Sequence, residues 1–70
     1  MKNYQFHLEP GEQDNVLAIL REFNDVLIDK VTDHSVNFTI ELDNEDADAL
    51  YYELLMEVEL RVFSERRHVH

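Results

Sequence analysis

The sequence contains no cysteine, and this absence excludes disulfide bonds and thiolate metal sites. Small domains of this size usually need such a staple, or a partner chain, to reach useful stability. Glycine and proline occur once each, as Gly11 and Pro10, so there is no glycine-rich loop to hold a phosphate group. Basic residues are also scarce, since 6 Lys and Arg oppose 16 Asp and Glu, for a formal net charge of −10. A chain this negative is repelled by nucleic acids and by anionic membranes.

Long apolar runs are absent as well, and none approaches the length that crosses a bilayer. The first six residues alternate polar and apolar side chains, which is not the pattern of a signal peptide. We therefore expect a cytoplasmic protein without a membrane partner. The hydrophobic fraction of 44% is typical of a folded chain, and 70 residues allow one domain. The prediction is a single acidic α/β domain over residues 1–70.

Side-chain periodicity predicts three strands and two helices. The strands are expected at residues 3–9, 26–31 and 36–43, and the helices at residues 10–25 and 44–64. Pro10 suits the first position of the first helix, and Asp43 or Asn44 can cap the second. The short turn before Val36 predicts an antiparallel hairpin. Residues 66–70 either fray or add a short edge strand.

The predicted order is β-α-β-β-α, with an optional final strand. This order matches most of a split βαβ, ferredoxin-like unit, in which both helices cover one face of an antiparallel-dominated sheet. The predicted class is therefore α+β. Because many unrelated functions use this framework, the fold does not choose among them.

The helix at residues 44–64 carries more apolar surface than one small sheet can cover. At 100° per residue, one stripe faces the sheet and consists of Ala47, Leu50, Tyr51, Leu54, Leu55, Val58 and Val62. A second stripe consists of Tyr52, Met56, Leu60 and Phe63. Either the first helix or the tail covers this second stripe, or it is an interface. We prefer the interface, and a homodimer is the commonest form that such an interface takes.

Acidic residues gather where basic ones are missing, between Lys30 and Arg61. We predict an acidic face made of Glu41, Asp43, Glu45, Asp46, Asp48, Glu53 and Glu57. One interpretation is that these acids only keep the protein soluble. The other is that they recognise a basic protein, such as one that normally binds nucleic acid, because a dense acidic face can imitate a row of phosphates. Inhibitors, antitoxins, immunity proteins and phage anti-defence proteins work in this way.

Catalytic and metal-binding patterns are weak. Ser35 and Ser64 lack the glycine-flanked turn of a nucleophilic serine, and the acidic run from Asp43 fails as a calcium loop because Asp48 stands where glycine is required. His7, His68 and His70 could converge on a metal, but a surface histidine and a polar tail explain them more simply. We predict no enzyme, no metal and no cofactor. The preferred function is a small acidic protein-binding module that inhibits a basic protein, and the alternative is a self-associating structural or assembly protein.

Overall fold

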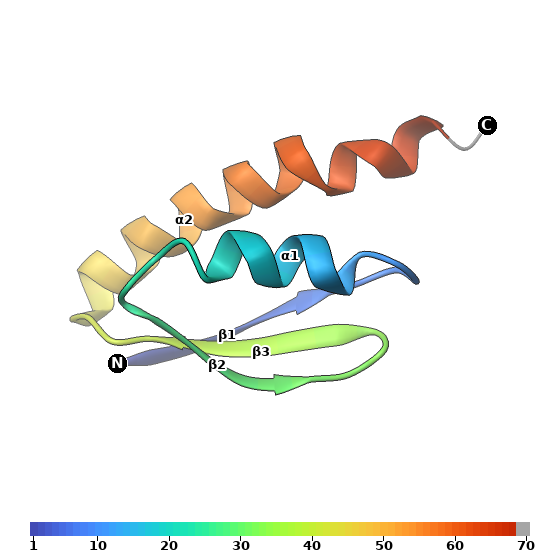
Figure 1. Ribbon diagram of the computed structural model, residues 1–70. Coiled ribbons are helices and arrows are strands. Elements are labelled where there is room, and N and C mark those ends of the chain that lie inside the picture. Colours follow the sequence, from blue (N-terminus) through green and yellow to red (C-terminus); the bar gives the residue numbers. More distant parts are fainter. Residues whose placement is uncertain (69–70) are drawn as a thin grey trace.

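The computed structural model describes residues 1–68, with the side chains of residues 1–66. It contains a three-stranded antiparallel sheet and two α-helices, so the α+β class is confirmed. The elements in chain order are β1 Lys2–His7, α1 Gln13–Leu20, β2 Val26–Val31, β3 Ser35–Ile40, α2 Asn44–Arg61 and the 3-10 helix η1 Phe63–His68. Both α-helices lie on the same face of the sheet, and α2 is much the longer (Figure 1).

The third strand is the centre of the sheet. The spatial order is β1-β3-β2, and both neighbours run antiparallel to β3. The turn between β2 and β3 is closed by Thr32, whose hydroxyl oxygen accepts the amides of His34 at 3.2 Å and Ser35 at 3.1 Å. The expected antiparallel hairpin is therefore confirmed. Because β1 and β2 lie on opposite sides of β3, the chain must cross over the sheet through α1.

The hydrophobic core lies between the sheet and the two helices. Phe38, at the middle of β3, is fully buried, and the ring of Phe6 packs against it at 5.1 Å between centroids. The other buried apolar residues lie in α1, β3 and α2 or directly follow β1 and α2: Leu8, Val16, Ile19, Leu20, Val36, Ile40, Ala47, Leu54, Val58 and Val62. The first stripe of α2 thus covers the sheet as expected, with Leu50, Tyr51 and Leu55 half-buried at its margins.

The first helix begins later than its sequence suggests. Pro10 and Gly11 form a turn, and Gly11 has a φ of +89°, a left-handed conformation that no α-helix contains. The prediction that Pro10 occupies the first helical position is wrong for this reason. The helix also ends early, because the amides of Glu22 and Phe23 donate to carbonyls only three residues back, at 3.0 and 3.2 Å.

The second helix ends at Arg61 and not near Ser64. Val62 breaks the α-helix with φ −126° and ψ −57°, and the chain continues as a 3-10 helix. Residues 66–68 belong to this 3-10 helix, so the optional edge strand over residues 66–70 is wrong for that part. Residues 69–70 lie outside the described residues. Arg66 anchors the segment to the β1–α1 turn, where its guanidinium donates to the carboxylate of Glu12 at 2.7 Å.

Candidate protein-binding surface

The outer face of α2 carries three exposed apolar side chains. Tyr52, Met56 and Leu60 follow one another at intervals of one helical turn, and they are 63%, 64% and 71% exposed. Neighbouring apolar residues at this spacing form one contiguous strip. We call these three residues the outer stripe. Among the described residues, neither α1 nor η1 covers them.

Phe63 does not join the outer stripe, although the sequence grouped it there. Its ring meets Phe6 edge-on at 6.2 Å between centroids, and the guanidinium of Arg66 lies over it at 4.0 Å. The reason is local: the α-helix ends at Arg61, so Phe63 no longer follows the helical spacing that the sequence count assumed. Phe63 is half-buried by its own chain.

Five of the seven predicted acidic residues are exposed, and among the described side chains none of the five forms an ion pair. We call this set the acidic surface; it comprises Glu41, Asp43, Glu45, Asp46 and Glu53. Asp43 is the residue that precedes α2, but its side chain makes no capping hydrogen bond. Glu53 follows Tyr52 and lies one turn before Met56, so acid and apolar side chains adjoin along α2.

The remaining two predicted acids serve the fold. Asp48 accepts hydrogen bonds from Lys2 at 2.8 Å and from the hydroxyl of Tyr4 at 2.7 Å, which ties the start of α2 to β1. The lysine, and after it the tyrosine, lower the pKa of Asp48, while burial and the Asp48 hydrogen bond raise the pKa of Tyr4 to about 12. Glu57 lies 3.6 Å from Arg61, which also pairs with Glu22 in the turn that follows α1.

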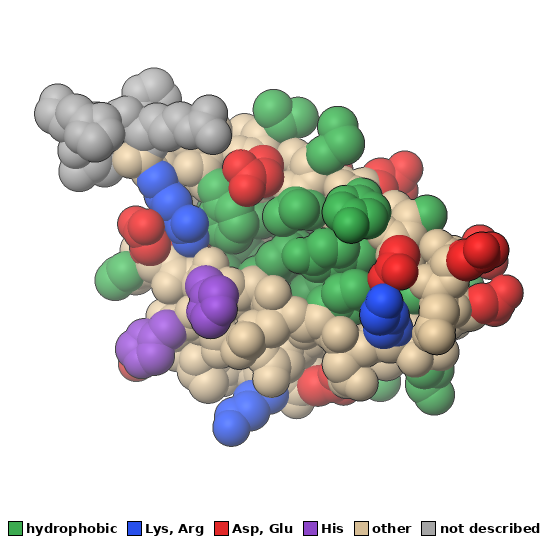
Figure 2. All heavy atoms as spheres, turned by 180° about the vertical axis from the view of Figure 1, so that it is seen from behind, with side chains coloured by type: hydrophobic (Ala, Val, Ile, Leu, Met, Phe, Trp, Pro, Cys, Tyr) green, Lys and Arg blue, Asp and Glu red, His purple; other side chains and the backbone are tan. Residues whose placement is uncertain are grey.

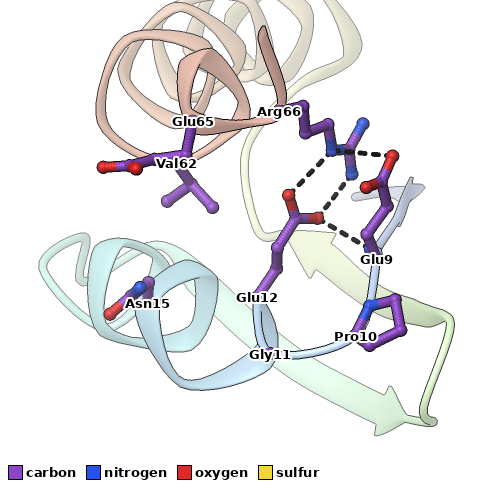
Figure 3. Close-up of a pocket in the computed structure, with 8 residues that line it drawn as sticks. All are labelled: Glu9, Pro10, Gly11, Glu12, Asn15, Val62, Glu65 and Arg66. Atoms are coloured by element: carbon purple, nitrogen blue, oxygen red, sulfur yellow. Dashed lines mark hydrogen bonds and ion pairs between the residues drawn. The ribbon is translucent and has the colours of Figure 1, made fainter. Parts of the chain in front are cut away.

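A second ion-pair cluster joins the end of the chain to the β1–α1 turn (Figure 3). The side chain of Glu12 is only 11% exposed, and its carboxylate accepts the Arg66 guanidinium and, at 2.7 Å, the amide of Glu9. The hydrogen bond from Arg66 lowers the pKa of Glu12 below its ordinary value. The hollow beside this cluster is open and lined mainly by charged and polar groups. The Glu12 carboxylate, which lines it, is already paired with Arg66. We therefore assign it a structural role.

The sequence alone did not predict this ion-pair cluster. Glu12 and Arg66 are separated by 54 positions, and both read as ordinary surface residues on a helix end and a tail. Only the low exposure of Glu12, which follows from the fold, makes the pair important.

The histidines do not form a site in the part of the chain that the structure describes. His7 is exposed at the end of β1, while the side chain of His68 and all of His70 fall outside the described residues. No group of three His, Asp or Glu side chains suited to a metal occurs among the described side chains. Likewise, no helix in the described range is long and apolar enough to span a membrane.

Comparison with protein-family models, with curated proteins and with solved structures finds no match to this chain. Functional inference therefore depends on the side chains themselves. The features that stand out are the outer stripe and the acidic surface beside it.

Proposed function

We propose that this protein is a small acidic protein-binding module that recognises a basic protein through α2 and the acidic surface. The observation that carries the proposal is the adjacency of two unsatisfied surfaces. The residues of the outer stripe are each more than 60% exposed, and the acidic surface beside it forms no ion pair with any side chain that the structure describes. Tyr and Met are frequent interface anchors, and unpaired like charges cost stability that the fold does not recover.

A partner that fits this surface has an apolar centre and a basic rim. Its positive charge offsets the repulsion among Asp43, Glu45 and Asp46, and long-range attraction speeds the encounter. A basic groove that normally holds nucleic acid meets this description. A module bound in that groove would inhibit the partner, because it would block access of the nucleic acid. The framework that presents the surface is ferredoxin-like, of the split βαβ type. The chain contains no cysteine and so depends on no disulfide bond, which suits the reducing conditions of the cytoplasm.

The test is capture from host lysate with three immobilised forms of the protein. The first is the wild type, and the second reverses the acidic surface as Glu41→Lys, Asp43→Lys and Glu53→Lys. The third is a charge-matched control, Asp14→Lys, Asp33→Lys and Glu65→Lys, at exposed acids away from the acidic surface. A specific partner is retained by the wild type and the control, is lost by the reversed form, and elutes as salt rises. Equal loss from both triple variants would show that only net charge matters, and would refute the proposal.

Self-association is a second candidate, favoured by the exposure of Tyr52, Met56 and Leu60. A second copy of the chain would then cover the outer stripe. Light scattering behind size exclusion measures the oligomeric state directly. In this case Met56→Glu dissociates the assembly and leaves the helical circular dichroism unchanged, because Met56 is 64% exposed in the single chain. A wild-type monomer at tens of micromolar would exclude this candidate.

A further inference from the structure

The free edge of β1 offers backbone groups to a further strand. In the described residues β1 pairs with β3 alone. The amide of Leu8 donates to the carbonyl of His34, so residues that alternate with Leu8 bond to β3 and those between them face outward. Asn3 and Gln5 therefore direct their N–H and C=O groups away from the sheet. The His7 carbonyl faces the same way, but it accepts a hydrogen bond from Arg66 at 3.2 Å.

A row of aromatic side chains lies directly beside this edge. Tyr51 of α2 stacks on Tyr4 of β1 at 4.5 Å between ring centroids, and Tyr52 meets Tyr51 at 5.7 Å. Phe63 continues the row through its contact with Phe6. We call these five residues the aromatic row. Figure 2 shows hydrophobic side chains gathered in the middle of the face that carries α2 and β1, with basic and acidic side chains at both ends of the hydrophobic area.

The two edges of the sheet differ in how well they are protected. On β2 the register shifts between Ile28 and Lys30, and the exposed charges of Asp29 and Lys30 stand at the irregularity. Bulges and charges of this kind are how natural sheets block their edges. The register of β1 is unbroken from Lys2 to His7, and the four residues between them carry no charge and no proline.

We propose that β1 pairs antiparallel with β1 of a second copy, so that one sheet continues across two chains. Opposed residues in such a pair lie on the same face of the sheet. The allowed registers are therefore those that place the core-facing residues of one β1 opposite the core-facing residues of the other. With Tyr4 opposite Tyr4, each Asn3 pairs with Gln5 of the second copy, and all the outward groups of both residues are satisfied. The register centred on Gln5 needs the His7 carbonyl, which Arg66 already holds.

The charges at the two ends of the aromatic row are locally complementary to those of a second copy. One end of the aromatic row carries Lys2 beside Asp48, and the other carries Arg66 beside Glu12. Antiparallel pairing brings the Lys2 end of one copy to the Arg66 end of the other. Each cation then faces the acids of the opposite end, while the acidic surface stays outside the contact.

The pairing goes beyond the proposed function because it uses the edge of β1, and it shares only Tyr52 with the outer stripe. Met56 and Leu60 lie on the side of α2 away from the sheet, so they remain free for a partner. In a single chain Tyr4, Tyr51 and Phe63 of the aromatic row are half-buried and Tyr52 is exposed, and in the dimer these residues become the covered centre.

The decisive variant is Gln5→Pro, which removes one outward N–H and leaves the pairing with β3 intact, as proline on a strand edge allows. Its matched control is Val31→Pro on the other edge. The amide of Thr32 donates to Ser35 at 2.9 Å, so the amide of Val31 also faces outward. Sedimentation velocity from micromolar to millimolar concentration is expected to show a dimer for wild type and for Val31→Pro, and a monomer for Gln5→Pro.

Amide exchange in the wild type supplies a second measurement that does not depend on whether Gln5→Pro folds. The amides of Asn3 and Gln5 should exchange more slowly as concentration rises, while those of Tyr4 and Phe6, bonded to β3, should not change. A wild-type monomer at millimolar concentration, a dimer retained by Gln5→Pro, or exchange at Asn3 and Gln5 that is independent of concentration would each overturn the proposal. A dimer lost in Met56→Glu but retained in Gln5→Pro would assign self-association to the outer stripe instead.

Discussion

Replacing Arg66 by alanine tests whether η1 is held to the β1–α1 turn by the ion pairs of this one residue, which are with Glu12 and, at 3.4 Å, with Glu9. The substitution leaves the Glu12 carboxylate, whose side chain is 11% exposed, with the Glu9 amide as its remaining donor from the cluster. Leaving a nearly buried acceptor unsatisfied costs about 1–3 kcal/mol. Because the Arg66 side chain is itself 30% exposed, water can replace part of the lost bonding, and a cost of about 1.5 kcal/mol is expected.

Loss of the Arg66–Phe63 stacking adds a smaller amount. The guanidinium lies 4.0 Å from the ring centroid, and such a contact contributes about 0.5 kcal/mol at a partly exposed site. The expected total is therefore about 2 kcal/mol in the free energy of unfolding, measured by urea titration near neutral pH. This is a large share of the stability of a small domain, which is of order 0.1 kcal/mol per residue.

The pH dependence of the free energy of unfolding separates the contribution of the Arg66–Glu12 ion pair from that of the packing of Arg66 on Phe63. Arg66 lowers the pKa of Glu12, so its stabilisation is fully present above the unfolded-state pKa of a glutamate and is lost as pH falls through the lowered folded-state value. The difference between wild type and Arg66→Ala should therefore shrink as pH falls below about 4. Glu12→Gln in both backgrounds isolates the coupling between the two residues. A difference below about 0.5 kcal/mol, or one that does not change with pH, would refute this account of the cluster.

Three further predictions concern the core, the β1–α2 contact and the first turn. Leu54→Ala, at a fully buried site, should cost about 2–5 kcal/mol in urea unfolding, whereas Leu60→Ala, at a site 71% exposed, should change stability by less than about 0.5 kcal/mol. The pKa of Tyr4 is raised to about 12, so ultraviolet titration should show one tyrosine ionising last, and Asp48→Asn should bring that step to lower pH. Since a raised pKa contributes stability that is lost as pH rises through it, Tyr4 should also make the wild type unfold more readily in strong alkali. Gly11→Ala should destabilise by about 1 kcal/mol because the φ of +89° strains any side chain, even with open space around it.

Elements with strong periodicity were predictable from the sequence, and their ends were not. Val36, Phe38 and Ile40 alternate with polar neighbours, and β3 follows this pattern from Ser35 to Ile40, although the predicted continuation of the strand to residue 43 is wrong. The range of β2 was predicted without error, at Val26–Val31. The start of α1 was missed because Gly11 takes a left-handed conformation that the sequence does not reveal, and its end was missed because the amides of Glu22 and Phe23 bond only three residues back. The end of α2 was missed because Val62 leaves the helical conformation, and the contact of Phe63 with Phe6 joins residues far apart in the chain, which helical spacing does not reveal.

The candidate surface was predictable where it depends on helical spacing alone. The exposure of Tyr52, Met56 and Leu60 follows from their angle on α2, and the core-facing stripe is buried as its angle requires. Acidic residues were harder to assign, because an acid on a helix face has the same sequence signature whether it is free or paired. Asp48 is paired only because β1 places Lys2 and Tyr4 within reach of it.

The two surfaces proposed for binding should respond to salt in opposite directions, and this follows from where the charge lies. A basic partner is attracted to the acidic surface, so added salt screens the attraction and weakens that complex. Two copies joined at β1 each carry a formal net charge of −10, and their contact is mainly aromatic and backbone in character. Salt therefore screens a net repulsion between the copies and strengthens the pair. The ion pairs at the ends of the aromatic row are partly exposed, which makes their own screening a smaller effect than the repulsion between whole chains.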